Sequence, residues 1–105
     1  MRRNSNASAQ SKALIVALKN ENRDVGFSAA LALGKIGPAA KDAVPALIVA
    51  LKNGGQNLGY AAAKALGQIG PAAKEAVPAL TEASKAGNRF VSKSAQEALK
   101  KIKAE

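Results

Sequence analysis

Residues 29–47 read AALALGKIGPAAKDAVPAL, and residues 62–80 read AAKALGQIGPAAKEAVPAL. The second stretch repeats the first after 33 positions, and most of the paired residues are identical. All prolines of the chain occupy matching positions in this repeat, Pro38 with Pro71 and Pro45 with Pro78. A fixed period of this length is typical of repeat proteins, in which each unit buries its apolar face against its neighbours. We therefore divide the chain into three repeats, at about 11–43, 44–76 and 77–105.

Each repeat predicts two short helices. The first helix is expected at residues 12–19, 45–52 and 78–85, and the second at residues 23–36, 56–69 and 89–103. Pro45 and Pro78 fit the first turn of a helix, where no backbone N–H is needed. We expect them to push the preceding Val44 and Val77 out of the helical region. Further expected signals are helix stops at Gly37 and Gly70 and N-caps at Asn22, Gly55 and Asn88.

The second helix of each repeat carries a regular apolar stripe. In the first repeat the stripe runs through Val25, Ala29, Leu33 and Ile36, at the spacing of one helical face. It recurs as Leu58, Ala62, Leu66 and Ile69, and again as Val91, Ala95, Leu99 and Ile102. Ala, the strongest helix former and a poor strand former, is frequent throughout. These features predict an all-α fold of three stacked helix pairs.

The repeat unit has a recognisable pattern. Residues 44–52 (VPALIVALK), a short turn, and residues 62–71 (AAKALGQIGP) together resemble the short bacterial type of HEAT repeat. Ankyrin and tetratricopeptide repeats have similar periods, but their characteristic motifs are absent. The resemblance implies a right-handed α-α superhelical solenoid in which the second helices line the concave side.

The chain departs from the family that it resembles at one pair of positions. Relatives usually carry an Arg early in the second helix and an Asp six residues earlier, which form a polar ladder along the stack. Here the Arg positions hold Gly26, Gly59 and Ser92, and the Asp positions hold Asn20, Asn53 and Ala86. Either the ladder was lost by drift or design, or the two glycines let another chain approach the backbone closely.

The predicted concave surface consists of second-helix positions that face neither neighbouring repeat. It grades from apolar and aromatic in the first repeat to basic in the third. Aromatic side chains flanked by lysines have the composition of a binding anchor. The alternative is that Phe27 and Tyr60 pack over small neighbours such as Ala30 and Ala63 as extra core. The candidate partner-binding residues are Phe27, Leu31, Lys35, Tyr60, Lys64, Gln68, Lys93 and Lys101, with Ser28, Ala61 and Ser94 at neighbouring free positions.

The two ends of the predicted stack differ in polarity. The first helix of the third repeat has Thr81, Glu82 and Ser84 where the other repeats are apolar, as expected of a terminal cap. The first repeat has no polar cap, so its outer side is expected to be exposed and to attract a partner or a second copy of the chain. The alternatives are coverage by the N-terminal tail or a longer array. The candidate self-association residues are Leu14, Ile15, Val16 and Val49.

Composition excludes several kinds of site. The 105 residues contain neither Cys nor His, which removes disulfides, thiol or imidazole catalysis and the usual zinc ligands. The chain has no glycine-rich phosphate loop with Gly-Lys-Ser/Thr, and spacing brings no two carboxylates of different elements together. We therefore predict no catalytic residue, no metal site and no cofactor.

Location and domain organisation follow from the same residues. The apolar run at residues 13–18 is shorter than a signal peptide or a membrane span requires. We expect a cytoplasmic protein without membrane insertion. Residues 1–11 are polar and are expected to form a flexible tail, followed by a single repeat domain at residues 12–105.

The sequence favours a binding or scaffolding role over catalysis. We expect a protein partner on the concave face, and the net charge of +9 favours an acidic one. The alternatives are a basic nucleic-acid-binding module, and a self-associating or designed scaffold without a ligand. The lysines are spread over every repeat, so nucleic acid is not the favoured partner.

Overall fold

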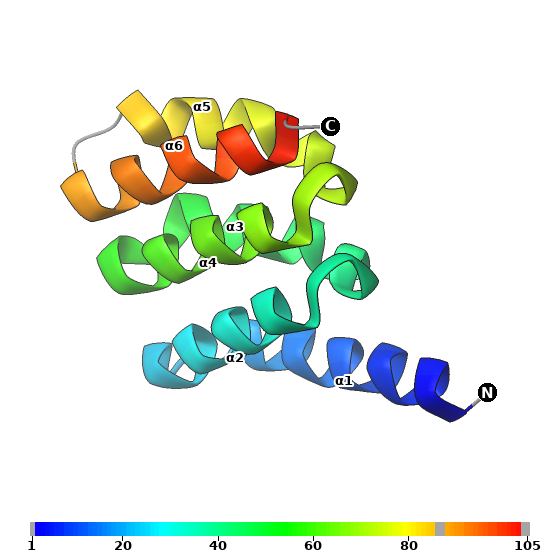
Figure 1. The fold of residues 1–105 in the computed structure, drawn as a ribbon. Coiled ribbons are helices and arrows are strands. Elements are labelled where there is room, and N and C mark those ends of the chain that lie inside the picture. Colours follow the sequence, from blue (N-terminus) through cyan, green and yellow to red (C-terminus); the bar gives the residue numbers. More distant parts are fainter. Residues whose placement is uncertain (1, 86–87, 104–105) are drawn as a thin grey trace.

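The chain forms α-helices and short 3-10 segments in a computed structural model, which describes residues 2–85 and 88–103 and the side chains from residue 9 onward. In order, the elements are α1 (Arg2–Leu18), α2 (Arg23–Ile36), η1 (Gly37–Ala43), α3 (Val44–Asn53), α4 (Gly55–Ile69), η2 (Gly70–Ala76), α5 (Val77–Lys85) and α6 (Arg89–Lys103). The helices pair as α1 with α2, α3 with α4, and α5 with α6, and the pairs stack on one another (Figure 1). The predicted all-α solenoid of three helix pairs is confirmed.

The stack has two layers. The first helices of the pairs, α1, α3 and α5, form one layer, and the second helices, α2, α4 and α6, form the other, which faces the viewer in Figure 1. The bounds of α2 and α6 are those expected from the apolar stripe, and α3 and α5 begin one residue earlier than expected. The 33-residue period therefore describes the geometry as well as the sequence.

The connections between successive pairs are 3-10 segments that begin at equivalent glycines. Gly37 and Gly70 have φ angles of 77° and 78°, which side-chain-bearing residues rarely adopt, and they end α2 and α4 as expected. Our expectation for Val44 and Val77 is wrong, because both have right-handed helical φ and ψ and begin their helices. The restriction before proline is only a preference, and each valine continues from a preceding 3-10 segment.

Asparagine side chains cap two of the second helices. The Asn22 side chain accepts a hydrogen bond from the backbone N–H of Asp24 at 2.8 Å, and the Asn88 Oδ1 atom accepts one from Val91 N at 3.0 Å. Both caps are confirmed. At α4 the cap position is Gly54 rather than the expected Gly55, and no side chain caps this helix.

The first helix is longer than the sequence suggested. Where we expected a flexible tail at residues 1–11, α1 already begins at Arg2. Residues 2–11 are therefore helical rather than irregular. Neither Pro nor Gly occurs between Arg2 and Leu18, so no residue interrupts the hydrogen-bond ladder that starts from the packed end of the helix.

The core between the layers is aliphatic. Leu33, Leu47, Leu66, Ile69 and Leu80 are its largest fully buried apolar side chains besides Val44, and alanines fill the space around them. The buried apolar residues in the described part of the chain include no aromatic side chain. A core of this kind requires close packing of backbones, because Ala occupies little volume.

Glycines bring the second helices close together. A Cβ atom on Gly34 would lie 3.1 Å from the Ala65 Cα atom, and one on Gly67 would lie 2.9 Å from the Ala98 Cα atom. Between the first helices, by contrast, there are hollows of about 540 and 580 Å³. The α2–α4–α6 layer is therefore the tighter one, and we call its solvent-facing side the inner face.

The glycines at the lost ladder positions are also enclosed. A Cβ atom on Gly26 would lie 3.3 Å from the Leu18 carbonyl oxygen and 3.4 Å from Leu58. A Cβ atom on Gly59 would lie 3.4 Å from Val91. Both glycines are buried within the stack. The alternative that another chain approaches them is therefore wrong.

The close approach at Gly67 predicts a stability change against helix propensity. Gly67→Ala is expected to lower the free energy of unfolding by roughly 1–3 kcal/mol, because the Ala98 backbone must move away. Helix propensity alone would make Gly67→Ala raise the free energy of unfolding by about 1 kcal/mol. Urea unfolding followed by circular dichroism measures the difference. Gly34→Ala is the matched control with a smaller expected loss, since the Gln68 side chain in its way is able to move. A stabilised Gly67→Ala chain would contradict the packing.

Replacing the buried Ser11 is predicted to stabilise the chain. Its side chain is 2% exposed, and its hydroxyl has no hydrogen-bond partner among the described residues. Ser92, also in a helix, donates from its hydroxyl to the Ser84 carbonyl oxygen at 2.6 Å. Ser11→Ala is expected to be more stabilising than Ser92→Ala by roughly 1–2 kcal/mol, since both changes share the propensity gain. Equal unfolding free energies of the two variants would refute this account.

Candidate functional site

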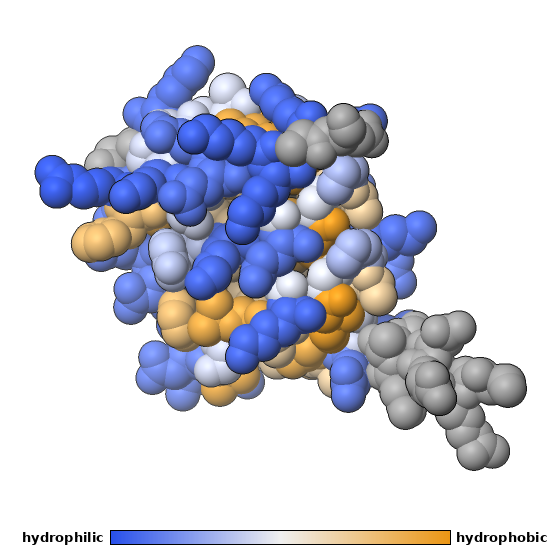
Figure 2. All heavy atoms as spheres, viewed as in Figure 1, coloured by the Kyte–Doolittle hydropathy of each residue, from blue (hydrophilic) through white to orange (hydrophobic). Residues whose placement is uncertain are grey.

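The α2–α4–α6 layer carries every aromatic residue of the chain. Phe27 on α2 and Tyr60 on α4 are half-buried, and Phe90 on α6 is 60% exposed. Hydrophobic atoms gather over α2 and hydrophilic atoms over α6 (Figure 2). The predicted gradient from an apolar to a basic end is therefore present on the inner face.

A small hollow between α4 and α6 brings several predicted residues together. It has a volume of about 110 Å³ and is lined by Tyr60 and Lys64 from α4 and by Glu97 and Lys101 from α6, with Gly67, Ser94 and Ala98 at its base. Lys64, Glu97 and Lys101 are exposed. The hollow thus combines an aromatic ring with two cationic side chains and one carboxylate.

The other predicted residues lie around this hollow or toward α2. Phe27 and Leu31 are one turn apart on α2, and both pack against the core while remaining partly exposed. Phe27 therefore packs on the core, as one of the two alternatives expected, and it still exposes part of its side chain. Gln68 lies over Gly34 of α2, and Lys93 is exposed one turn before Glu97. Lys35 is exposed at the rim of a different hollow, on the end of the stack.

One predicted register does not belong to the exposed surface. Ala61 is fully buried, and Ser94 is 7% exposed. The Ser94 hydroxyl donates a hydrogen bond to the Tyr60 carbonyl oxygen at 3.2 Å. The idea that these positions are free is wrong, because the close spacing of the second helices turns this register into the interface between repeats.

Phe90 is a candidate that sequence reasoning missed. It lies three residues before Lys93 and four before Ser94, so it shares their side of α6. The signal was present, since an aromatic residue stands where the other repeats have Asp24 and Asn57. The inner-face positions predicted from the period begin only at the second turn of each helix, with Phe27, Tyr60 and Lys93.

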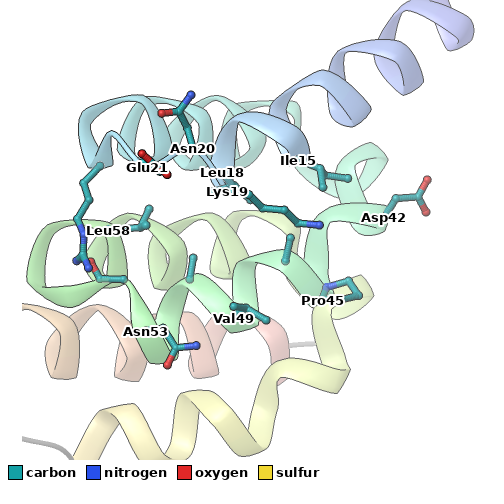
Figure 3. A pocket seen from close by; sticks show the side chains of 14 residues that line it. Ile15, Leu18, Lys19, Asn20, Glu21, Asp42, Pro45, Val49, Asn53 and Leu58 are labelled. Carbon is teal, nitrogen blue, oxygen red and sulfur yellow. The ribbon is translucent and has the colours of Figure 1, made fainter.

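The outer layer has a groove between α1 and α3. Its volume is about 540 Å³. Its apolar residues include Ile15, Leu18, Ala46, Val49 and Leu58, and its polar ones include Lys19, Asn20, Glu21 and Asn53. The Lys19 side chain extends along the groove, whereas Asp42 points away from it (Figure 3). The hollow between α3 and α5 is lined by residues at equivalent positions, so the grooves follow from the repeat itself.

One arginine links two repeats at the end of this groove. The Arg23 Nη1 atom donates a hydrogen bond to the Gly54 carbonyl oxygen, across the step from the first to the second pair. Gly54 follows the last turn of α3, where carbonyl groups lack helical partners. Sequence reasoning did not single out Arg23, because the equivalent positions hold Gln56 and Arg89 and show no consistent pattern.

The predicted self-association edge is not one surface. Ile15 and Val49 line the groove between α1 and α3. Leu14 lies on the other side of α1, in hollows that it shares with α2. Val16 is 71% exposed and lines none of these hollows. Leu14, Ile15 and Val16 are consecutive on α1, and a helix distributes consecutive residues around its circumference, whereas Val49 belongs to α3.

The described residues offer little for metal binding or membrane insertion. Residues 2–85 and 88–103 contain no group of three or more acidic, His or Cys residues that could hold a metal ion. Among the helices in the described part of the chain, none is long and apolar enough to cross a membrane.

Comparison with known proteins identifies a family. The family described as HEAT repeats matches residues 11–100. No curated protein matches the chain.

The Arg23 bond predicts a local contribution to stability. Arg23→Gln is expected to lower the free energy of unfolding by roughly 1 kcal/mol, because the Gly54 carbonyl oxygen loses its charged donor. Arg89→Gln changes the equivalent and exposed residue of the last repeat and serves as the control. Thermal unfolding of both variants tests the difference, and an unchanged Arg23→Gln chain would show that the bond contributes nothing.

Proposed function

The chain belongs to the HEAT-repeat family, and on this premise we propose that its inner face binds a partner protein segment that carries apolar and acidic side chains. HEAT repeats generally mediate protein–protein interaction or scaffolding and are generally non-catalytic. The proposed mechanism is docking, in which partner side chains settle against Phe27, Leu31 and Tyr60 while lysines attract an acidic flank.

The position of the aromatic residues is the observation that carries the proposal. The chain has two Phe, one Tyr and no Trp, and none of the three is fully buried. They stand one on each helix of the α2–α4–α6 layer, and Phe27 also packs against the core. Aromatic side chains dominate binding energy at protein interfaces because they bury a large area with little loss of conformational entropy.

The charges of the inner face define the polarity of the partner. Lys64, Lys93 and Lys101 are exposed on α4 and α6, and Glu97 is the acidic neighbour that lines the hollow with two of them. Complementary charge speeds association and selects among partners more than it adds affinity. An acidic flank of the partner is therefore expected over α6, with its apolar side chains over α2.

The test uses two labelled synthetic peptides with the same amphipathic helical pattern. One is built from Leu and Glu, and the other has Lys in place of each Glu. We expect the Leu/Glu peptide to bind more tightly in fluorescence polarisation, because its carboxylates meet the inner-face lysines. Combining Phe27→Ala with Tyr60→Ala is expected to weaken this binding by at least about tenfold.

Val16→Ala is the matched control. It truncates an apolar side chain that is 71% exposed in the outer layer, so it should leave peptide binding unchanged. Circular dichroism establishes that every variant keeps its helicity. Equal affinity for the two peptides, or equal binding by the double variant, would refute the proposal. So would tighter, strongly salt-dependent binding of mixed-sequence DNA, which would indicate a nucleic-acid partner instead.

A further inference from the structure

The end of the stack formed by α1 and α2 is an apolar surface that the described residues leave open. In Figure 1 these helices lie at the lower end, with no helix beyond them. Two adjoining hollows there share Leu14 and Ala32. We define the end face by residues that line them: Leu14, Ala17, Val25, Ser28, Ala32 and Ile36.

The equivalent residues of the second repeat show how such a surface is buried within the stack. The residues equivalent to Leu14 and Ile36 in the second repeat are Leu47 and Ile69, and both are fully buried. The residue equivalent to Val25 is Leu58, which lies beside Gly26 of the first repeat and is 7% exposed, whereas Val25 itself is 38% exposed. The end face thus corresponds to the surface on which repeats stack, and the described residues do not cover it.

The opposite end of the same chain cannot serve as this neighbour. Within the stack, Gly34 and Gly67 let the next second helix approach, through Ala65 and Ala98. The equivalent residue at the other end is Lys100, which is exposed on α6 together with Gln96. Docking that end onto Ala32 would bury a lysine against apolar side chains without a partner charge. This cost disfavours head-to-tail stacking of copies.

The charges at the rim of the end face are self-complementary. Asp24 lines one hollow and Lys35 lines the other, near opposite ends of α2. Their midpoint along the helix lies between Ala29 and Ala30, close to the middle of the apolar stripe. A two-fold axis at this midpoint would place α2 against an antiparallel copy of itself. Each Asp24 would then lie beside the Lys35 of the other copy. The antiparallel pair also opposes the two helix dipoles.

We infer that the end face binds a second copy of this chain, head to head, in a two-fold symmetric dimer centred on α2. The apolar residues of each copy cover those of the other, and two Asp24–Lys35 pairs set the direction of the helices. This surface is separate from the aromatic anchors of the inner face, so dimerisation does not depend on the proposed partner.

Analytical ultracentrifugation across a wide range of chain concentration tests the inference. The expected mass moves from 10.6 kDa to twice that value as concentration rises. Ala32→Glu is expected to raise the dimer dissociation constant about 100-fold or more, because it buries unpaired charge at the centre. Gln96→Glu adds the same charge at the other end and is expected to have no such effect.

Charge reversal tests the geometry separately from folding. Asp24→Lys is expected to weaken the dimer roughly tenfold, and adding Lys35→Asp is expected to restore it. The Phe27→Ala, Tyr60→Ala chain should dimerise like the unaltered one, which separates this inference from the proposed function. A chain that stays monomeric at every concentration would overturn the inference. A dimer that the second reversal fails to restore, or that Gln96→Glu disrupts equally, would also do so.

Discussion

The contact between backbones of successive second helices is the constraint on which the rest of the structure depends. Gly34 against Ala65, and Gly67 against Ala98, leave no room for a side chain at the crossing. This closeness tightens the α2–α4–α6 layer, whereas hollows remain between the helices of the other layer. Alanines and aliphatic side chains fill the buried core of the described residues, and Phe27, Tyr60 and Phe90 all keep exposed surface.

Sequence-based prediction succeeds for features that recur in every repeat, and it fails where one repeat differs from the others. The bounds of α2 and the stops at Gly37 and Gly70 follow from repeated local signals. The start of α1 does not, because it has no equivalent in the repeat. The inner-face positions on each helix followed from the period, whereas Phe90 was missed because its register is polar elsewhere. The residues of the predicted self-association edge do not form one surface, because consecutive apolar residues of a helix point in different directions.

The missing polar ladder is replaced by packing and by a few individual bonds. The Arg register of relatives becomes a pair of glycines, beside the carbonyl oxygens of Leu18 and Leu51. In the third repeat the same register is Ser92, whose hydroxyl donates to the equivalent carbonyl of Ser84. Arg23 supplies a link from the first repeat to the second. The repeats here stack through apolar contact rather than through charge. Polar residues on the inner face and on the outer layer can therefore be substituted without loss of this stacking.

The two proposed surfaces meet on α2, and their geometry is linked. A two-fold axis that passes between the two α2 helices, perpendicular to their length, keeps both inner faces on the same side of the dimer. The apolar residues Phe27 and Leu31 of the two copies then lie near the centre, and the basic helices α6 lie at the two ends. Such a surface matches a partner with an apolar middle and acidic ends, or two linked segments. In the second case binding of one segment raises the effective concentration of the other, so modest affinity at each inner face is sufficient for stable capture.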